Sequence, residues 1–402
     1  MSGKSPLGNP SIQVTPDHQL KKVEAPIETP KEGEVLLHIK ATGICGSDIH
    51  FWKKGRIGSL VVNCDCILGH EAAGVVLQCG AGVTSLKPGD RVAVEPGVPC
   101  GECFLCIDGR YNLCEDVKFS GVAPYHGTLQ RYKVHPAKWL HKSYSSSKCC
   151  SQGLIATSRC PWYFKPTCLS PTNFMITPDF QTTEGALIEP LSVVMHAIER
   201  TRLTLGTGSL ICGAGPIGLI ALAAARASGA HPLVITDLEP QRLEFAKKFV
   251  PGCTTYLVDR SLEAEGNAKA IRKLFGDTEY SAPRTVLECT GVESSVCTAA
   301  LAVRRGGTVM VIGVGKEVMN HLPFMHMSLA EIDLKFINRY RDTWPAGIAC
   351  VSGGILNLKD LITHTFPLEE GIAALELCSD ITKGSIKVQV VDDDDAEFEV
   401  QK

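Results

Sequence analysis

The chain reads SLICGAGPIGLIALAAARASG from residue 209 to residue 229. An apolar strand runs into a glycine turn, and an alanine-rich helix follows the turn and ends at Gly229. A G-x-G-x-x-G turn between a strand and a helix binds the pyrophosphate of a dinucleotide. Its first glycine allows the tight turn, the second lets the backbone approach the phosphates, and the third lets helix and strand pack. We therefore expect a dinucleotide on the turn residues Gly213, Gly215, Pro216, Ile217 and Gly218.

An acidic residue at the end of the next predicted strand bears on the choice of cofactor. The segment PLVITD places Asp237 19 residues after Gly218, where an acid accepts the ribose hydroxyls. Because a carboxylate repels a 2′-phosphate, we predict NAD rather than NADP. Arg242 could stack near the adenine, contact the ribose or accommodate a 2′-phosphate, and Asp237 disfavours the last of these.

The alternation of strands and helices continues beyond the turn. PQRLEFAKKF (240–249) predicts a helix, and RTVLECTG (284–291) and GGTVMVIGVG (306–315) predict strands that end in glycine. This alternation is typical of an α/β fold with a doubly wound parallel sheet. Val314, after the last of these strands, is expected to contact the cofactor. The first third of the chain shows short, closely spaced strands such as EVLLHIKATGI (34–44), which favour an antiparallel barrel-like or sandwich-like domain.

Length and composition exclude several classes of protein. The 402 residues are enough for two or three domains, and 44% hydrophobic with 21% charged residues excludes a disordered chain, a collagen and a coiled coil. A net charge of −3 gives no electrostatic case for nucleic acid as a partner. The longest uncharged stretch, 203–225, is interrupted by glycines and a proline, so we expect no membrane span. With no secretory signal at the start, we expect a cytoplasmic, reducing setting.

Four of the 18 cysteines lie close together in PCGECFLCIDGRYNLC (99–114), with the spacing C-x2-C-x2-C-x7-C. Four thiolates can close tetrahedrally around one Zn²⁺, whose charge offsets their mutual repulsion. Such a site has no open position, so we predict a structural zinc and not a catalytic one. The alternatives are four unrelated thiols or a zinc-ribbon nucleic-acid module, but a loop of that kind should be rich in Lys and Arg, and this one holds only Arg110. The predicted ligands are Cys100, Cys103, Cys106 and Cys114.

A second possible ligand set lies upstream, in GICGSDIHFW (43–52) and LGHEAAG (68–74). Cys45, His70 and Glu71 offer a thiolate, an imidazole and a carboxylate, a mixed set of the kind that holds a catalytic zinc with an open position. Taken alone, these residues are also compatible with ordinary packing. Glu189, in ALIEPLSV, is either an acid at a helix start or a buried carboxylate that partners zinc or its water.

These features occur in one order along the chain and end in RY-x-x-TWP (339–345). In this the sequence resembles the zinc-dependent medium-chain dehydrogenases, and within them the polyol branch of sorbitol, xylitol and fungal L-arabinitol dehydrogenases. The discriminating residues are Glu71 after His70, Glu189, and the pair Arg339 and Tyr340. The resemblance implies a GroES-like β-rich catalytic domain, split into residues 1–191 and 338–402 around a Rossmann domain at 192–337. It also implies a homotetramer.

The resemblance further implies roles for the zinc-site residues. Cys45, His70 and Glu189 would hold the catalytic zinc, Glu189 directly or through water. Glu71 would be a direct or alternate ligand. Ser47 and His50 would lie near the zinc-bound oxygen as a proton route, while Asp48 would orient a ligand.

Arg339 and Tyr340 would contact substrate hydroxyls or the cofactor, and Phe51 and Glu189 would line the substrate pocket. The implied reaction passes a hydride from a secondary hydroxyl of a polyol to NAD and gives a ketose. L-Arabinitol is the expected substrate, with xylitol or sorbitol as alternatives. A general secondary-alcohol dehydrogenase, or an isoform that binds zinc and NAD without turnover, remains open.

The segment at residues 143–175 departs from the family pattern. It holds three basic residues, no Asp or Glu, and four cysteines, with no clear helical or strand period. It is a surface loop, a translated intron or faulty gene model, or a third metal site. Long surface insertions cost little entropy, and the cysteine spacing is not a recognised ligand pattern.

Overall fold

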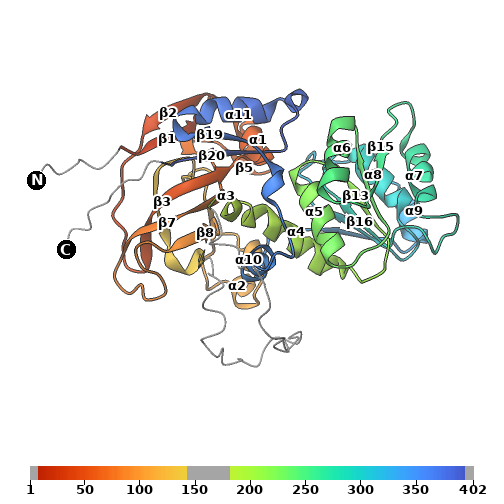
Figure 1. The fold of residues 1–402 in the computed structure, drawn as a ribbon, viewed down its shortest axis with the longest axis horizontal. Coiled ribbons are helices and arrows are strands. Elements are labelled where there is room, and N and C mark those ends of the chain that lie inside the picture. The colour runs from red at the N-terminus through yellow and green to blue at the C-terminus, as the bar shows by residue number, and fades with distance from the viewer. Residues whose placement is uncertain (1–7, 143–181, 394–402) are drawn as a thin grey trace, which may run out of the picture.

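The structure, a computed structural model, describes residues 8–142 and 182–393. Figure 1 shows a β-rich lobe beside an α/β lobe, with α4 (Ile188–Thr201) and α10 (Trp344–Ser352) lying between them. The segment at 143–175, with its possible third metal site, lies outside the described residues. In the part of the chain that is described, no helix is long and apolar enough to cross a membrane.

The α/β lobe is built on a six-stranded parallel sheet with the order β15-β14-β13-β16-β17-β18. The strand order reverses between β13 and β16, and ligands of such sheets bind outside the carboxyl ends of the strands at this reversal. Successive residues face opposite cores: Ile211 packs with α5 and α6, while Leu210 and Cys212 pack with α7 and α8. The predicted doubly wound sheet is therefore confirmed. Its strands are β13 (Ser209–Cys212), β14 (Leu233–Asp237), β15 (Thr254–Leu257), β16 (Thr285–Glu288), β17 (Thr308–Val311) and β18 (Asp333–Phe336). Its helices are α5 (Pro216–Ala227), α6 (Pro240–Phe249), α7 (Ala264–Lys273), α8 (Glu293–Ala302) and α9 (Phe324–Leu329).

The β-rich lobe centres on a seven-stranded sheet with the order β12-β8-β7-β3-β20-β19, to which β11 adds by pairing with β3. A smaller sheet has the order β2-β1-β6. The longer strands of the β-rich lobe, from both sheets, are β1 (Pro10–Val14), β2 (Leu20–Glu24), β3 (Glu34–Gly43), β7 (Glu71–Cys79), β8 (Arg91–Val94), β11 (Tyr132–Pro136), β12 (Leu140–Lys142), β19 (Ile362–Pro367) and β20 (Lys387–Val391). The short strands are β4 (Arg56–Ile57), β5 (Leu60–Val61), β6 (Cys66–Ile67), β9 (Gly97–Val98) and β10 (Lys118–Phe119). The helices are α1 (Gly46–Lys54), α2 (Phe104–Ile107), α3 (Thr182–Gly185) and α11 (Gly371–Ser379).

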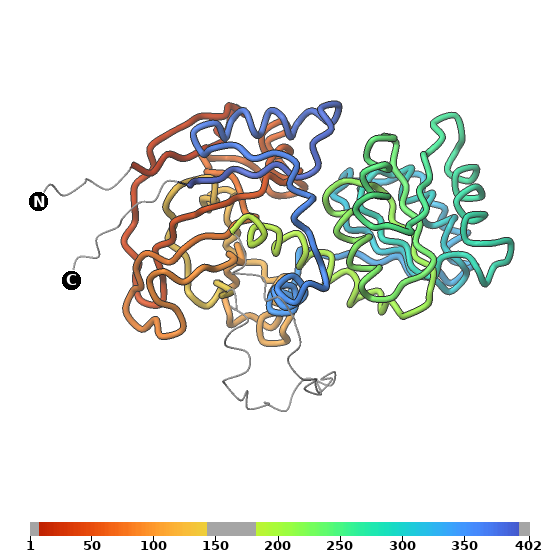
Figure 2. The backbone as a smooth tube through the Cα atoms, in the orientation of Figure 1, coloured from red at the N-terminus to blue at the C-terminus, as the bar shows by residue number. Residues whose placement is uncertain are grey.

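The end of the chain completes the sheet of the β-rich lobe. Strand β20 pairs antiparallel with β3, with Gln389 opposite Gly43, and β19 pairs with β20. Figure 2 shows this C-terminal segment, in blue, lying among the red and orange strands of the first hundred residues. The first and last parts of the chain therefore share one sheet, while the boundaries at 191/192 and 337/338 stay predictions.

The long strand β3 pairs irregularly with β7, and a glycine of β7 lies beside the irregularity. The pairing of β3 with β7 shifts register between Ile39 and Ala41. At Gly74 an added Cβ would lie 2.3 Å from the carbonyl oxygen of His38, so only glycine lets the backbones approach this closely. Beyond the shift, Gly43 at the end of β3 pairs with Glu71 at the start of β7, where the mixed ligand set lies.

Candidate metal and cofactor sites

The four clustered cysteines form a compact group around α2. The Sγ atoms of Cys103 and Cys106 are 3.5 Å apart, as are those of Cys100 and Cys114, and Cys100 and Cys106 are 3.9 Å apart. A tetrahedral zinc with bonds of about 2.3 Å places its sulfurs roughly 3.8 Å from one another. Backbone N–H groups of Glu102 and Cys103 hold the pKa of the Cys100 thiol below its ordinary value, whereas burial raises the pKa of the Cys106 and Cys114 thiols, so the spacing of the sulfurs is what bears on the site. The group fits a closed zinc site.

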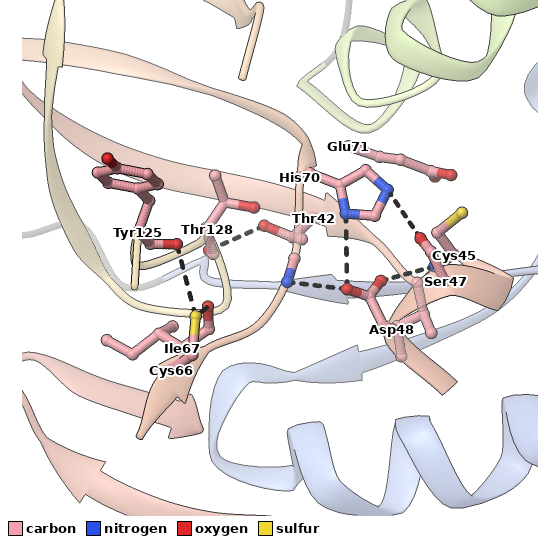
Figure 3. Close-up of polar contacts among 12 residues, drawn as sticks. Thr42, Cys45, Ser47, Asp48, Cys66, Ile67, His70, Glu71, Tyr125 and Thr128 are labelled. Carbon is pink, nitrogen blue, oxygen red and sulfur yellow. Dashed lines mark hydrogen bonds and ion pairs between the residues drawn. The ribbon is translucent and has the colours of Figure 1, made fainter. Parts of the chain in front are cut away.

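The mixed ligand set also converges. Ligand atoms of Cys45, His70 and Glu71 all lie within 4.8 Å of one another. Cys45 precedes α1, His70 follows Gly69, and Glu71 is the first residue of β7. Figure 3 shows the Cys45 thiol and the Glu71 carboxylate pointing into the space beside one edge of the His70 ring. A thiolate, an imidazole and a carboxylate on three sides of one space fit a zinc with an open position.

Asp48 fixes the geometry of this set. Its carboxylate accepts hydrogen bonds from the backbone N–H groups of Cys45, at 2.9 Å, and Gly69, at 3.1 Å. The same carboxylate lies 3.5 Å from His70 Nδ1, so the other ring nitrogen, Nε2, faces the shared space, where Ser47 Oγ also lies. Burial raises the pKa of Asp48, but His70 and the two N–H groups outweigh it, so the pKa is lowered. Asp48 thereby joins the loop before α1 to the start of β7 (Figure 3).

Glu71 has a partner that the sequence analysis did not predict. Lys387 Nζ lies 2.8 and 2.7 Å from the two carboxylate oxygens of Glu71 and 3.2 Å from the carbonyl oxygen of Ile44. Lys387 and Glu71 are 3% and 1% exposed, so the pair is a buried ion pair. At Gly43 an added Cβ would lie 2.2 Å from the Glu71 carboxylate, so a glycine there leaves room for the pair. The lysine-bound carboxylate is a positioned ligand that zinc would share with Lys387.

Glu189 lies beside the cluster but outside the set that meets within 4.8 Å. It begins α4 and is buried, at 5% exposure. Burial raises the pKa of Glu189 to about 7, with the charge of Glu71 adding to the rise and His70 opposing it. Tyr340 is 3% exposed and packs edge-on against Trp344, and burial beside Glu189 raises the pKa of its hydroxyl. The structure therefore brings Glu189 and Tyr340 together next to the mixed ligand set.

The other residues predicted near the open site lie along α1. Ser47 Oγ is 3.3 Å from His70 Nε2, on the side that faces the shared space. His50 is half-buried, and burial together with Lys54 lowers its pKa. Within residues 8–142 and 182–393, His50 makes no hydrogen bond to the ligand cluster. Phe51 is 3% exposed and belongs to the core cluster that includes Ile44 and Phe119, so the structure does not place it on an open surface.

The glycine turn lies at the carboxyl end of β13, as predicted from its sequence. Gly213 has φ +96°, a left-handed conformation that favours glycine. At Gly218 an added Cβ would lie 1.7 Å from the Gly213 carbonyl oxygen, whereas at Gly215 the nearest atom would be Arg242 Nη1 at 3.8 Å. The backbone at Gly215 is therefore accessible, and Pro216 and Ile217 begin α5, whose N-terminus points at the same space. The turn fits a dinucleotide pyrophosphate.

Asp237 lies beside the turn, at the end of β14. Its carboxylate accepts hydrogen bonds from the N–H groups of Ala214, at 2.7 Å, and Glu239, at 2.9 Å. Val314 is 54% exposed and follows β17 at the same edge of the sheet. Arg339 extends over the ring of Phe119, with its guanidinium carbon 3.6 Å from the ring centroid. The centroid of the Phe119 ring is in turn 5.7 Å from that of the His70 ring, so the Arg339 guanidinium lies beside the open site.

Comparison with known proteins decides the family. Residues 31–145 match the alcohol dehydrogenase GroES-like domain, and residues 216–353 match the zinc-binding dehydrogenase domain. The chain belongs to the zinc-binding alcohol dehydrogenase family. The resemblance predicted from the sequence and the predicted fold class are thereby confirmed.

Relatives within the family cover nearly the whole chain. L-Arabinitol 4-dehydrogenase of Aspergillus oryzae is 47% identical over 373 residues, which are 92% of this chain and 88% of that protein. Sorbitol dehydrogenase of Bos taurus is 40% identical over 369 residues, 92% of each chain. Among solved structures, L-idonate 5-dehydrogenase of Escherichia coli aligns with a TM-score of 0.77 at 25% identity, covering 96% of this chain and 99% of that one. This chain, as a member of the family, is an oxidoreductase.

Proposed function

We propose that the protein is a zinc- and NAD-dependent polyol dehydrogenase that oxidises a secondary hydroxyl of L-arabinitol, or alternatively of xylitol or sorbitol, to a ketose. The observation that carries the proposal is the convergence of Cys45, His70 and Glu71 within 4.8 Å, with Glu189 and Arg339 beside them. The relatives named as L-arabinitol 4-dehydrogenases and sorbitol dehydrogenases support the polyol as the substrate class.

The residues that would hold the catalytic zinc act on the hydroxyl that reacts. A zinc ion on Cys45, His70 and a carboxylate of Glu71 or Glu189 would lower the pKa of that hydroxyl. Asp48 holds the His70 ring by Nδ1, and Lys387 holds Glu71, so the ligands keep their directions as substrate enters. Ser47 Oγ, 3.3 Å from His70 Nε2, would accept the hydroxyl proton while giving its own proton to His50 on the same helix, and His50 would release a proton to solvent.

The α/β lobe would bind the cofactor, and Arg339, beside the open site, would bind the rest of the substrate. NAD on the glycine turn would accept the hydride, with Asp237 binding the ribose hydroxyls and Val314 and Arg242 flanking the cofactor. The Arg339 guanidinium offers planar donors to the other hydroxyls of a polyol, which a simple alcohol lacks. A cofactor held by the α/β lobe and a zinc held by the β-rich lobe would meet where the lobes face one another.

We further propose that the chain forms a homotetramer in the cytoplasm. Strand β18 is an edge strand of the parallel sheet, and apolar side chains are exposed beside it: Phe324 at 70%, Leu329 at 73% and Phe336 at 59%. Exposed edges and apolar patches of this kind pair with other chains. The fourteen cysteines of the described ranges are free thiols, which fits a reducing compartment.

A substrate panel tests the proposal. With NAD as cofactor, we expect kcat/KM for L-arabinitol, xylitol or sorbitol to exceed that for 2-butanol by at least about tenfold, because simple alcohols leave Arg339 unpaired. Chelation that strips the open site should abolish turnover, and added zinc should restore it. Equal rates on 2-butanol and the polyols would favour a general secondary-alcohol dehydrogenase. NAD binding with no turnover of any alcohol would indicate a binding protein without activity.

A further inference from the structure

The segment that leaves the α/β lobe, residues 337–343 between β18 and α10, has an unusual backbone. Arg339 has φ +55° and Asp342 has φ +53°, and neither is glycine. Side chains disfavour this left-handed conformation, so surrounding contacts must hold it. We call these residues the connecting segment, and residues 100–114 the four-cysteine lobe.

The four-cysteine lobe supplies such contacts on the N-terminal side of Arg339. Asn112 Nδ2 donates to the carbonyl oxygen of Asn338 at 2.8 Å, and Asn338 Nδ2 donates to the carbonyl oxygen of Asn112 at 3.1 Å. Each asparagine side chain thus binds the other residue's backbone, although the two lie 226 positions apart. Asn112 is 8% exposed whereas Asn338 is exposed, so the pair anchors a surface residue of the connecting segment to a buried residue of the lobe.

The lobe also holds the segment on the C-terminal side. Arg341 Nη1 donates to the carbonyl oxygen of Gly109 at 3.2 Å, and the backbone N–H of Asp342 donates to the Tyr111 hydroxyl at 2.9 Å. That hydroxyl donates in turn to Glu95 at 2.9 Å, and Glu95 is 2% exposed. The left-handed residue Asp342 is therefore tied through Tyr111 to a buried carboxylate of the β-rich lobe.

Arg339 and Tyr340 stand between these two sets of hydrogen bonds. The Arg339 guanidinium carbon lies 3.6 Å from the centroid of the Phe119 ring, which packs against His70. Tyr340 is buried beside Glu189. Arg339 and Tyr340 directly follow Asn338 and directly precede Arg341, which both hydrogen-bond to the four-cysteine lobe. A shift of the backbone at residues 338–342 would therefore move both side chains away from the open site.

We propose that the four-cysteine lobe positions the substrate pocket: Tyr111 and Asn112 hold the connecting segment in its left-handed turns and so direct the Arg339 guanidinium at the polyol hydroxyls. This inference rests on the proposed polyol dehydrogenase activity. It makes Tyr111 and Asn112 positioning residues, and it gives a lobe with a closed metal site an influence on substrate affinity.

The test uses N112A and Y111F in the full-length, zinc-loaded protein. We expect each to raise KM for the polyol by about tenfold, because each removes one hydrogen bond to the connecting segment, while KM for NAD and NADH affinity by fluorescence stay unchanged. In an R339Q background, N112A should raise KM no further, because its effect passes through the guanidinium. An equal increase in both backgrounds, or an unchanged KM with a lower thermal midpoint, would overturn the proposal.

N9A is the matched control for lost stability. Asn9 is 1% exposed, and its side chain also bonds distant backbone, with Nδ2 3.2 Å from the Tyr132 carbonyl oxygen. It should lower the thermal midpoint and leave KM for the polyol unchanged. A second readout needs no activity: trypsin should cut after Arg339 or Arg341 faster in N112A than in wild type or N9A. If the wild type oxidises no polyol, the proposed function fails, and equal cleavage rates would then separately refute the positioning role.

Discussion

The ion pair of Lys387 with Glu71 is a residue-scale feature with a measurable consequence. Replacing Lys387 with Met leaves a carboxylate buried at 1% exposure without its cation. Breaking a buried pair from one side costs about 3–5 kcal/mol, whereas neutralising both partners costs much less. We therefore expect K387M to unfold at a clearly lower temperature than wild type, and K387M/E71Q to recover most of the loss. Thermal denaturation after zinc removal measures this, since zinc would otherwise compensate the carboxylate.

One partner of this ion pair, Glu71, was predictable from the sequence, and the other, Lys387, was not. His70 and Glu71 stood out because they adjoin each other next to a glycine, and Asp48 because it is close in sequence to Cys45. Lys387 is 316 positions from Glu71, and no local pattern links them. The one available signal is strand β20, where a lysine and a glutamine alternate with valines although every one of Lys387, Val388, Gln389 and Val390 is buried. A lysine on a strand buried on both faces needs an anionic partner.

At the scale of the element, the four-cysteine lobe makes the clearest prediction. Three of its sulfur pairs are 3.5 to 3.9 Å apart, while its helix α2 has only four residues, so a metal rather than packing should hold it. We expect C106A to bind one zinc fewer per chain than wild type and to unfold at a lower temperature. C79A, which removes a half-buried thiol at the end of β7, should keep the full zinc content. Elemental analysis of the purified proteins decides, and an unchanged zinc content in C106A would contradict the site.

Elements were predictable where their determinants are local. The glycine turn, α5 and the cysteine spacing all follow from residues within about twenty positions, and the structure places them accordingly. The hydrogen bonds between Asn112 and Asn338 were not predictable, because neither residue belongs to a periodic pattern or a motif. Phe51, expected at the substrate pocket, is 3% exposed and packs in the same core cluster as Phe119, so its role at the pocket stays a prediction.

On the scale of the whole molecule, buried neutral histidines set the response to acid. His135 is 3% exposed, and its Nε2 lies 2.9 Å from the carbonyl oxygen of Glu95. Burial, with Lys133 adding to it, lowers the pKa of His135 to about 3. In the unfolded chain His135 has an ordinary pKa near 6.5, so below that pH it binds a proton that it does not bind in the folded chain. Stability is therefore unaffected above about pH 6.5 and falls as the pH drops toward 3, by about 2 kcal/mol at pH 5 from this residue.

The variant H135Q separates this effect from the protonation of metal ligands, because the metal ligands are the same in H135Q and in wild type. Glutamine keeps a donor for the Glu95 carbonyl oxygen and does not titrate. Urea unfolding at pH 7.5 and pH 5 should show wild type losing about 2 kcal/mol more than H135Q between the two conditions. Identical losses would mean that His135 is already protonated in the folded protein at pH 5, or that it stays neutral in both states. Either result would show that acid sensitivity resides elsewhere, with His196, whose pKa burial and two nearby arginines lower to about 4, as the next residue to replace.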